Sequence, residues 1–140
     1  MARGNHRGGG SSPHAGRRAP SRWELQAKGC HNIGLVSPTH FSAQIIEAIF
    51  FAAEKGLSVP IIYNSNGYDS VETLKLFEGI IDLYLPDFKY GNDEYANRFS
   101  FAPHYFETAK KALKEMYRQV GCQMIYENDI LMRGMIIRHL

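Results

Sequence analysis

The sequence predicts an α/β fold in which a parallel sheet carries helices on its outside. Two observations lead to this fold class. Short apolar runs suited to buried strands alternate with segments in which apolar residues recur every three to four positions. Each of the first three runs turns abruptly polar where it ends. Alternation of this kind implies right-handed crossovers between parallel strands, and 140 residues are enough for one domain with a core.

The first two strands and the helix between them come from residues 32–63. The run "NIGLV" (32–36) is short and apolar, as a buried strand is, and "VPIIY" (59–63) has the same character. The intervening helix is expected to end at Gly56, because glycine commonly stops helices. Its apolar face collects Ile45, Ile46, Ile49, Phe50 and Ala53.

A second helix and a third strand follow. Residues 70–77 predict a short helix, with Asp69 and Glu72 at the spacing of a capping box. The run "IIDLYL" (80–85) is the third buried strand. An irregular stretch is expected after it.

A longer helix is expected between Pro103 and Gly121. Proline is favoured in the first turn of a helix, and glycine is favoured just beyond the last turn. The apolar side of this helix carries Phe106, Ala109, Leu113, Met116, Tyr117 and Val120.

The last part of the chain predicts a hairpin and a fourth strand. Residues 123–134 have the pattern of a hairpin that turns at Asn128 and Asp129, and "GMIIRHL" (134–140) has the pattern of a buried strand. Four parallel strands fit an open flavodoxin-like sheet or half of a (β/α)8 barrel, which needs about 250 residues when complete. The last strand reaches the end of the sequence with no helix after it, which favours about half of a (β/α) barrel over residues 23–140.

Residues 1–22 differ in composition from the rest of the chain. They are rich in glycine, serine and proline, and they predict a disordered basic leader. No aromatic residue is interleaved with the basic ones, which disfavours nucleic acid as a partner. The basic residues are Arg3, Arg7, Arg17, Arg18 and Arg22.

Two cysteines, Cys30 and Cys122, lie far apart and form no Cys-x-x-Cys motif. This predicts neither a disulfide framework nor a metal motif, and it indicates a reduced, cytoplasmic protein. No apolar run approaches the roughly 18 residues of a membrane-spanning helix, so no membrane partner is expected.

The candidate site lies at the carboxyl ends of the strands, where parallel α/β folds bind their ligands. Hydroxyl and amide groups follow the first two strands, with Pro38 between them as a turn residue. Asp87 and Lys89 follow the third strand and point to the same face, because side chains alternate along a strand. Such a pair suits a zwitterion; the alternative is that the two charges pair with each other or cap the following loop. The polar residues of the first two ends are Ser37, Thr39, Asn64, Ser65 and Asn66.

His31 and His40 flank the first strand. Imidazole titrates near neutral pH, so either residue is a candidate acid, base or ligand. Such a histidine is more often a hydrogen-bonded loop residue.

Four segments together resemble the middle of a radical S-adenosylmethionine protein, in the branch related to pyruvate formate-lyase activating enzyme. They are "GCHNIGLVSPTH", "NSNGYDSVETLKL", "IIDLYLPDFKY" and "KEMYRQVG". The resemblance covers about residues 23–140. It implies a partial or full (β/α) barrel, a small-molecule cofactor cleaved to a 5′-deoxyadenosyl radical, a 4Fe-4S cluster and, in the full-length enzyme, a protein substrate.

The resemblance also implies roles for particular residues. Ser37, Pro38 and Thr39 stand where the family has a Gly-Gly-Glu-type loop that holds the methionyl amino group. Asn64 and Ser65 match the start of a strand end that reads Asp-Thr-Asn-Gly in relatives. In the family's Asp-x-Lys motif, Asp87 would serve a cation and the amino end of S-adenosylmethionine, and Lys89 would hold its carboxylate.

The sequence departs from the family at the cluster, because Cys-x-x-x-Cys-x-x-Cys occurs nowhere in the chain. A fragment truncated at both ends, from a wrongly placed gene start or a broken gene, is therefore expected, and no cluster on this chain alone. Two alternatives stay open. One is a Schiff-base aldolase with Lys89 as nucleophile. The other is a degenerate, non-enzymatic fragment with exposed sheet edges.

Overall fold

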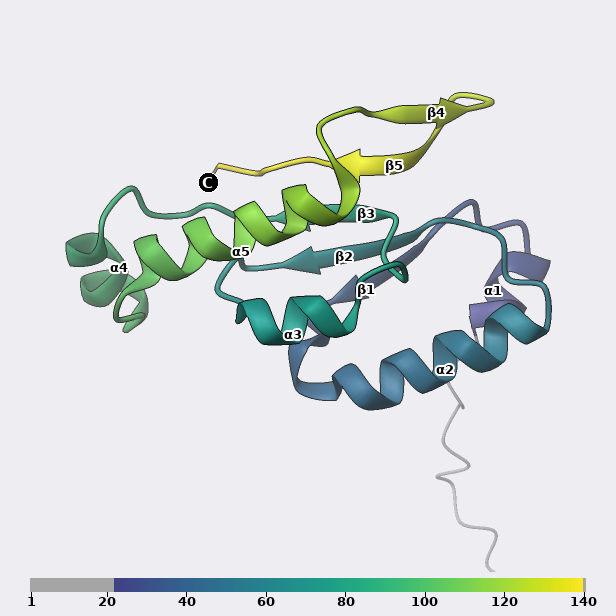
Figure 1. The fold of residues 1–140 in the computed structure, drawn as a ribbon, viewed down its shortest axis with the longest axis horizontal. Coiled ribbons are helices and arrows are strands. Elements are labelled where there is room, and N and C mark those ends of the chain that lie inside the picture. Colours follow the sequence, from purple (N-terminus) through teal and green to yellow (C-terminus); the bar gives the residue numbers. More distant parts are fainter. Residues whose placement is uncertain (1–21, 140) are drawn as a thin grey trace, which may run out of the picture.

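The computed structural model describes residues 22–139, and the predicted leader lies outside these residues except for its last position. Figure 1 shows the elements in order along the chain. The helices are α1 (Arg22–Ala27), the 3-10 helix η1 (Pro38–Phe41), α2 (Ser42–Glu54), α3 (Val71–Leu76), α4 (Asp93–Ser100) and α5 (Tyr105–Val120). The strands are β1 (Ile33–Val36), β2 (Ile61–Ser65), β3 (Leu83–Pro86), β4 (Ile125–Glu127) and β5 (Ile130–Met135).

The five strands form one sheet in the order β1-β2-β3-β5-β4. Strands β1, β2, β3 and β5 are parallel neighbours and lie side by side in chain order. Strand β4 pairs antiparallel with β5 at the edge. The predicted α/β class and parallel sheet are therefore confirmed.

Three helices pack on one face of the sheet. Tyr63 and Tyr84 alternate to this face, where Phe77 lies against Tyr63 with ring centroids 5.3 Å apart. Met116 of α5 is fully buried in the same cluster, to which α2 contributes Ile49. A single core thus joins α2, α3 and α5 to the strands, as their arrangement in Figure 1 reflects.

The opposite face of the sheet carries apolar side chains with little cover. Val36 is 74% exposed and Ile136 is 42% exposed. A hollow of about 310 Å³ lies on this face, and Ile62, Leu83 and Leu85 form part of its wall.

The predicted fourth strand is only partly correct, because the strand beside β3 is β5 (Ile130–Met135), which begins earlier and shares only residues 134 and 135 with the predicted run 134–140. Ile136 and Ile137 are 42% and 47% exposed, so this run is not buried as predicted. Asn128 and Asp129 both have positive φ, as a two-residue hairpin turn requires, so β4 and β5 form the predicted hairpin. Beyond it the backbone continues along β3, since the N–H groups of Ile136 and Arg138 donate to the carbonyls of Tyr84 and Pro86.

Two local predictions are wrong. Ser70, and not Asp69, caps α3, because its side chain accepts a hydrogen bond from the Thr73 N–H. The irregular stretch after β3 contains α4, which is capped by Asn92 through the Tyr95 N–H. Helix α4 has a single buried residue, Ala96, so its sequence lacks the apolar repeat that reveals longer helices.

None of the helices in residues 22–139 has the length and apolar character that crossing a membrane requires.

Candidate functional site

The strand register brings three of the predicted polar ends together. Val36 lies beside Asn64, and Ser65 lies beside Pro86, so β1, β2 and β3 end at the same edge. An isolated parallel bridge then joins Asp87 to Arg138.

Four side chains form what we call the strand-end cluster: Asn64, Asp87, Lys89 and Arg138. The Arg138 Nη2 atom lies 2.7 Å from Asn64 Oδ1 and 2.6 Å from Asp87 Oδ1. Lys89 Nζ lies 3.5 Å from Asp87 Oδ2. Asp87 is buried, whereas the side chains of Lys89 and Arg138 are 38% and 40% exposed. The cluster therefore carries two cations, one carboxylate and a route to solvent.

Two buried atoms of the cluster make no hydrogen bond with any described residue. They are Asp87 Oδ1 and Arg138 Nε. The short approach of Arg138 to Asp87 Oδ1 is an ion pair by distance, but its direction is not that of a hydrogen bond. Buried polar atoms are nearly always hydrogen-bonded in native proteins, so these two atoms have hydrogen-bonding capacity that the described residues leave unused, although Asp87 Oδ1 is already in the ion pair with Arg138.

The first strand end contributes less to this cluster. The Thr39 hydroxyl donates to Asp69 Oδ1 at 2.6 Å and lies 3.2 Å from the Tyr63 hydroxyl. Pro38 is buried under this loop. Ser37 is exposed, has φ of 48°, and its N–H donates to the Asn64 carbonyl. Thr39 and Pro38 thus secure the loop, whereas Ser37 is exposed.

The second strand end is fixed by its own turn. The buried Ser65 hydroxyl accepts a hydrogen bond from the Gly67 N–H, and Asn66 Oδ1 accepts one from the Tyr68 N–H. Gly67 has φ of 77°, and a Cβ there would overlap the carbonyl oxygen of Asp87. Only glycine fits this close approach, which locks the turn after β2 against the end of β3.

Asp69 is a buried residue whose surroundings the sequence does not reveal. Its Oδ1 accepts hydrogen bonds from Thr39 and Tyr63, while its Oδ2 has no partner among the described residues. Burial, and next the charge of Asp69, raise the pKa of the Tyr63 hydroxyl above its ordinary value. The Tyr63 hydroxyl therefore stays protonated and holds Asp69 in place.

Two hollows open beside the cluster, and Asn66 and Tyr68 line both. The smaller, of about 190 Å³, also has Ser37 and His40 in its wall. The larger, of about 220 Å³, has Lys89 at one side. Its remaining walls include three tyrosines and an exposed phenylalanine: Tyr68, Tyr90, Tyr105 and Phe101.

The two histidines have different surroundings. His40 lies on the wall of the smaller hollow, within the candidate site. His31 precedes β1 at the opposite end of the strand, and its Nδ1 lies 2.8 Å from Asn32 Nδ2.

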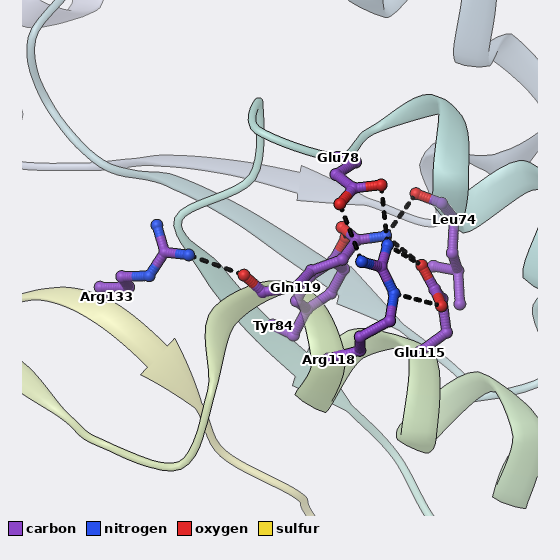
Figure 2. Close-up of polar contacts among 7 residues, drawn as sticks. All are labelled: Leu74, Glu78, Tyr84, Glu115, Arg118, Gln119 and Arg133. Carbon is purple, nitrogen blue, oxygen red and sulfur yellow. Dashed lines mark hydrogen bonds and ion pairs between the residues drawn. The ribbon is translucent and has the colours of Figure 1, made fainter.

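A second polar network lies on the helix side of the sheet, and Figure 2 shows it. Gln119 accepts from the Tyr84 hydroxyl at 2.6 Å and donates to Glu115 and to the Leu74 carbonyl. Arg118 donates through Nε and Nη2 to the two carboxylate oxygens of Glu115. Hydrogen bonds from Arg118, and next from Gln119, lower the pKa of Glu115 to about 2.

This helix-side network joins α5 to both α3 and β3. Arg118 reaches Glu78 just beyond α3, where its Nη2 lies 2.7 Å from a carboxylate oxygen. Arg133 donates to the Gln119 carbonyl and so ties β5 to the end of α5. The segment "KEMYRQVG" therefore has a structural role in this fold.

The described residues offer no group of three or more His, Cys, Asp or Glu side chains that could hold a metal ion. Cys30 and Cys122 are both free and exposed.

Sequence reasoning missed Arg138. The signal was present, since the register that places Gly134 beside Leu83 also places Arg138 beside Asp87. It could be used only once the fourth strand was aligned to the third.

Comparisons with known proteins give a partial match. No protein-family model matches the chain, and no solved structure matches it. A curated relative, "Uncharacterized protein MJ0674" of Methanocaldococcus jannaschii, is 43% identical over 54 residues. The matched segment is 39% of this chain and 16% of the relative, so the chain spans a small part of the length of the protein it matches.

Proposed function

We propose that this chain is part of a radical S-adenosylmethionine enzyme related to pyruvate formate-lyase activating enzyme. In this proposal the strand-end cluster holds the amino-acid end of S-adenosylmethionine. One observation carries the proposal: the cluster combines both signs of charge with two buried atoms that make no hydrogen bond with the described residues, Asp87 Oδ1 and Arg138 Nε, at the ends of adjacent parallel strands.

Of the two candidate folds, the architecture agrees better with half of a (β/α) barrel than with an open doubly wound sheet. In a doubly wound sheet the strand order reverses at a switch point and helices cover both faces. Here β1, β2, β3 and β5 follow in chain order, and one core joins α2, α3 and α5 to a single face. In this proposal the bare apolar face would be the interior of a barrel, where inward side chains form layers.

The cluster chemistry suits the zwitterion of an amino acid. Asp87 Oδ1 accepts hydrogen bonds, so it can take a proton of an ammonium group. Lys89 and Arg138 each have donors beyond those used within the fold, and they can hold a carboxylate. Arg138 was not part of the sequence-based assignment, and it strengthens the carboxylate end of the site.

The donors in the described residues do not fit a 4Fe-4S cluster. Such clusters are held by several thiolates at set spacing, and this sequence has two cysteines, both exposed and far apart in the chain. When bound together, the cluster and S-adenosylmethionine supply a 5′-deoxyadenosyl radical. We assign to this chain only the binding of the amino-acid end of S-adenosylmethionine. We expect no stable 4Fe-4S cluster after anaerobic reconstitution of the chain alone.

Two further parts of the proposal rest on simpler observations. Both cysteines are free thiols, which suits a reducing compartment such as the cytoplasm. The aldolase alternative gains no support, because Lys89 Nζ is engaged in an ion pair with Asp87 Oδ2 at 3.5 Å, whereas Schiff-base formation needs an amine that is free to attack a carbonyl.

The test is a titration of S-adenosylmethionine into the chain, followed by two-dimensional NMR. One or two charge-assisted hydrogen bonds contribute about 1.5 to 3 kcal/mol each before the cost of association, so binding should be no tighter than about 1 mM. Lys89→Ala should weaken this binding several-fold. Lys55→Ala, at an exposed position after α2, is the matched control and should leave it unchanged. Equal binding by the parent and Lys89→Ala would contradict the assignment of Lys89.

A further inference from the structure

Helix α5 has a second apolar stripe besides its buried face. Phe106, Leu113 and Tyr117 are separated by seven and then four residues, the spacing of one side of a helix. Tyr117 is 50% exposed, and Phe106 and Leu113 are half-buried. Together with Phe88 they form a groove of about 290 Å³. The buried face of the same helix instead presents Tyr105, Ala109, Ala112, Met116 and Val120.

The groove has the dimensions of a helix-packing surface. Residues 106–117 extend about 16 Å along the axis of α5, or about three turns. On its other side α5 packs against α3, where Gln119 of α5 donates a hydrogen bond to the Leu74 carbonyl. The groove itself is lined only by α5 and Phe88, so no second helix among the described residues fills it.

The rim of the groove is positively charged. Lys110 and Lys114 line it, and no acidic side chain of the described residues does. Lys110 Nζ lies 5.7 Å from the centre of the Phe106 ring and 3.4 Å from Glu107, an exposed contact that contributes little. An apolar floor between two lysines is complementary to an amphipathic element with acidic edges.

The same charges argue against two other occupants. In a twofold dimer through this groove, the lysines of one copy would face those of the other, and like charges at an interface are unfavourable. Residues 1–21 contain four arginines and no acid, so their charge does not complement the rim either.

We propose that this groove docks an acidic amphipathic helix of a partner protein. Apolar side chains of that helix would pack between Phe88, Phe106 and Leu113. Its glutamates or aspartates would pair with Lys110 and Lys114. The groove lies along α5 and shares a border with the strand-end cluster, because Phe88 stands between Asp87 and Lys89 in the sequence. The inference does not rest on the function proposed above.

The test uses two synthetic peptides of about four helical turns with blocked ends. Both have leucines along one helical face. One has glutamates on either side of that face, and the other has lysines at the same positions. Fluorescence anisotropy of the labelled peptides with the full chain at low salt should show at least tenfold tighter binding of the acidic peptide. The charge reversal Lys110→Glu with Lys114→Glu should reverse this preference.

Lys111→Glu is the matched control, because Lys111 is an exposed residue of α5 outside the groove. It should preserve the preference for the acidic peptide. Equal binding of the two peptides, or loss of the preference in Lys111→Glu, would overturn the proposal. Self-association of the chain that disappears in the double variant would also overturn it, in favour of a second copy in the groove.

Discussion

The strand-end cluster and the helix-side network are built from similar charged and amide groups, but they differ in how completely those groups are paired. In the helix-side network, Gln119 and Arg118 satisfy Glu115, Tyr84 and Glu78 within the fold. In the strand-end cluster, Asp87 Oδ1 and Arg138 Nε stay without hydrogen bonds from the described residues.

This difference separates groups that hold the fold together from groups that can act on a ligand. A fully paired network contributes to stability, because losing one member leaves its partners unsatisfied. An incompletely paired cluster contributes less to the fold, and its free atoms can be satisfied by a ligand. The predictions below test whether the two regions divide in this way.

The largest effect on stability is expected from Gln119→Leu in the helix-side network. The substitution leaves the buried Tyr84 hydroxyl without its acceptor and removes a donor from Glu115, so we expect a loss of about 2 to 4 kcal/mol in the free energy of unfolding. Urea denaturation measures it. Gln44→Leu, at an exposed position of α2, is the control and should change stability by less than about 0.5 kcal/mol. Similar losses in both variants would mean that the network has no special structural role.

An intermediate effect is expected from the titration of Glu115. Its pKa in the folded protein is about 2, below its ordinary value of 4.5, because Arg118 and Gln119 donate hydrogen bonds to the carboxylate. A depressed folded-state pKa adds stability above the unfolded-state value, and this stability is lost as the pH falls from about 4.5 to about 2. Urea unfolding at several pH values should show a steeper decline in this window for the parent than for Glu115→Gln. Parallel pH profiles would contradict the role of Glu115.

The smallest effect on stability is expected in the strand-end cluster. Asp87→Asn keeps the shape of the side chain and removes only its charge. Because both cationic partners are more than a third exposed, the ion pairs contribute about 1 kcal/mol or less. A destabilisation as large as that of Gln119→Leu would remove the distinction between the two regions.

Much of the fold could be predicted because its signals are local. Apolar runs such as residues 32–36 and 80–85 mark strands, and Gly56 and Gly121 mark where helices end. Helix α4 could not be found in this way, because it has only one buried residue and is held by its Asn92 cap.

The candidate site was predictable only in part, because side-chain partners depend on tertiary register. The alternation rule correctly places Asp87 and Lys89 on one side of the strand end, where they form an ion pair. Arg138 lies 51 positions after Asp87 in the sequence, and no local pattern indicates that the two residues are neighbours. The contact of Thr39 with Asp69 likewise has no local signal. Such contacts depend on how distant segments align in the fold, and this alignment cannot be read from local patterns in a single sequence.

The central claim is that the strand-end cluster is open to a ligand while the helix-side network is closed. The most direct measurement is an NMR titration of S-adenosylmethionine that observes the arginine Nε–H groups of the chain. Arg138 Nε is buried without a partner, whereas Arg118 Nε donates to Glu115 at 3.0 Å. We predict that the Arg138 resonance shifts and approaches saturation at millimolar concentrations, and that the Arg118 resonance stays in place. A titration in which Arg138 does not shift, or in which Arg118 shifts equally, would contradict the account.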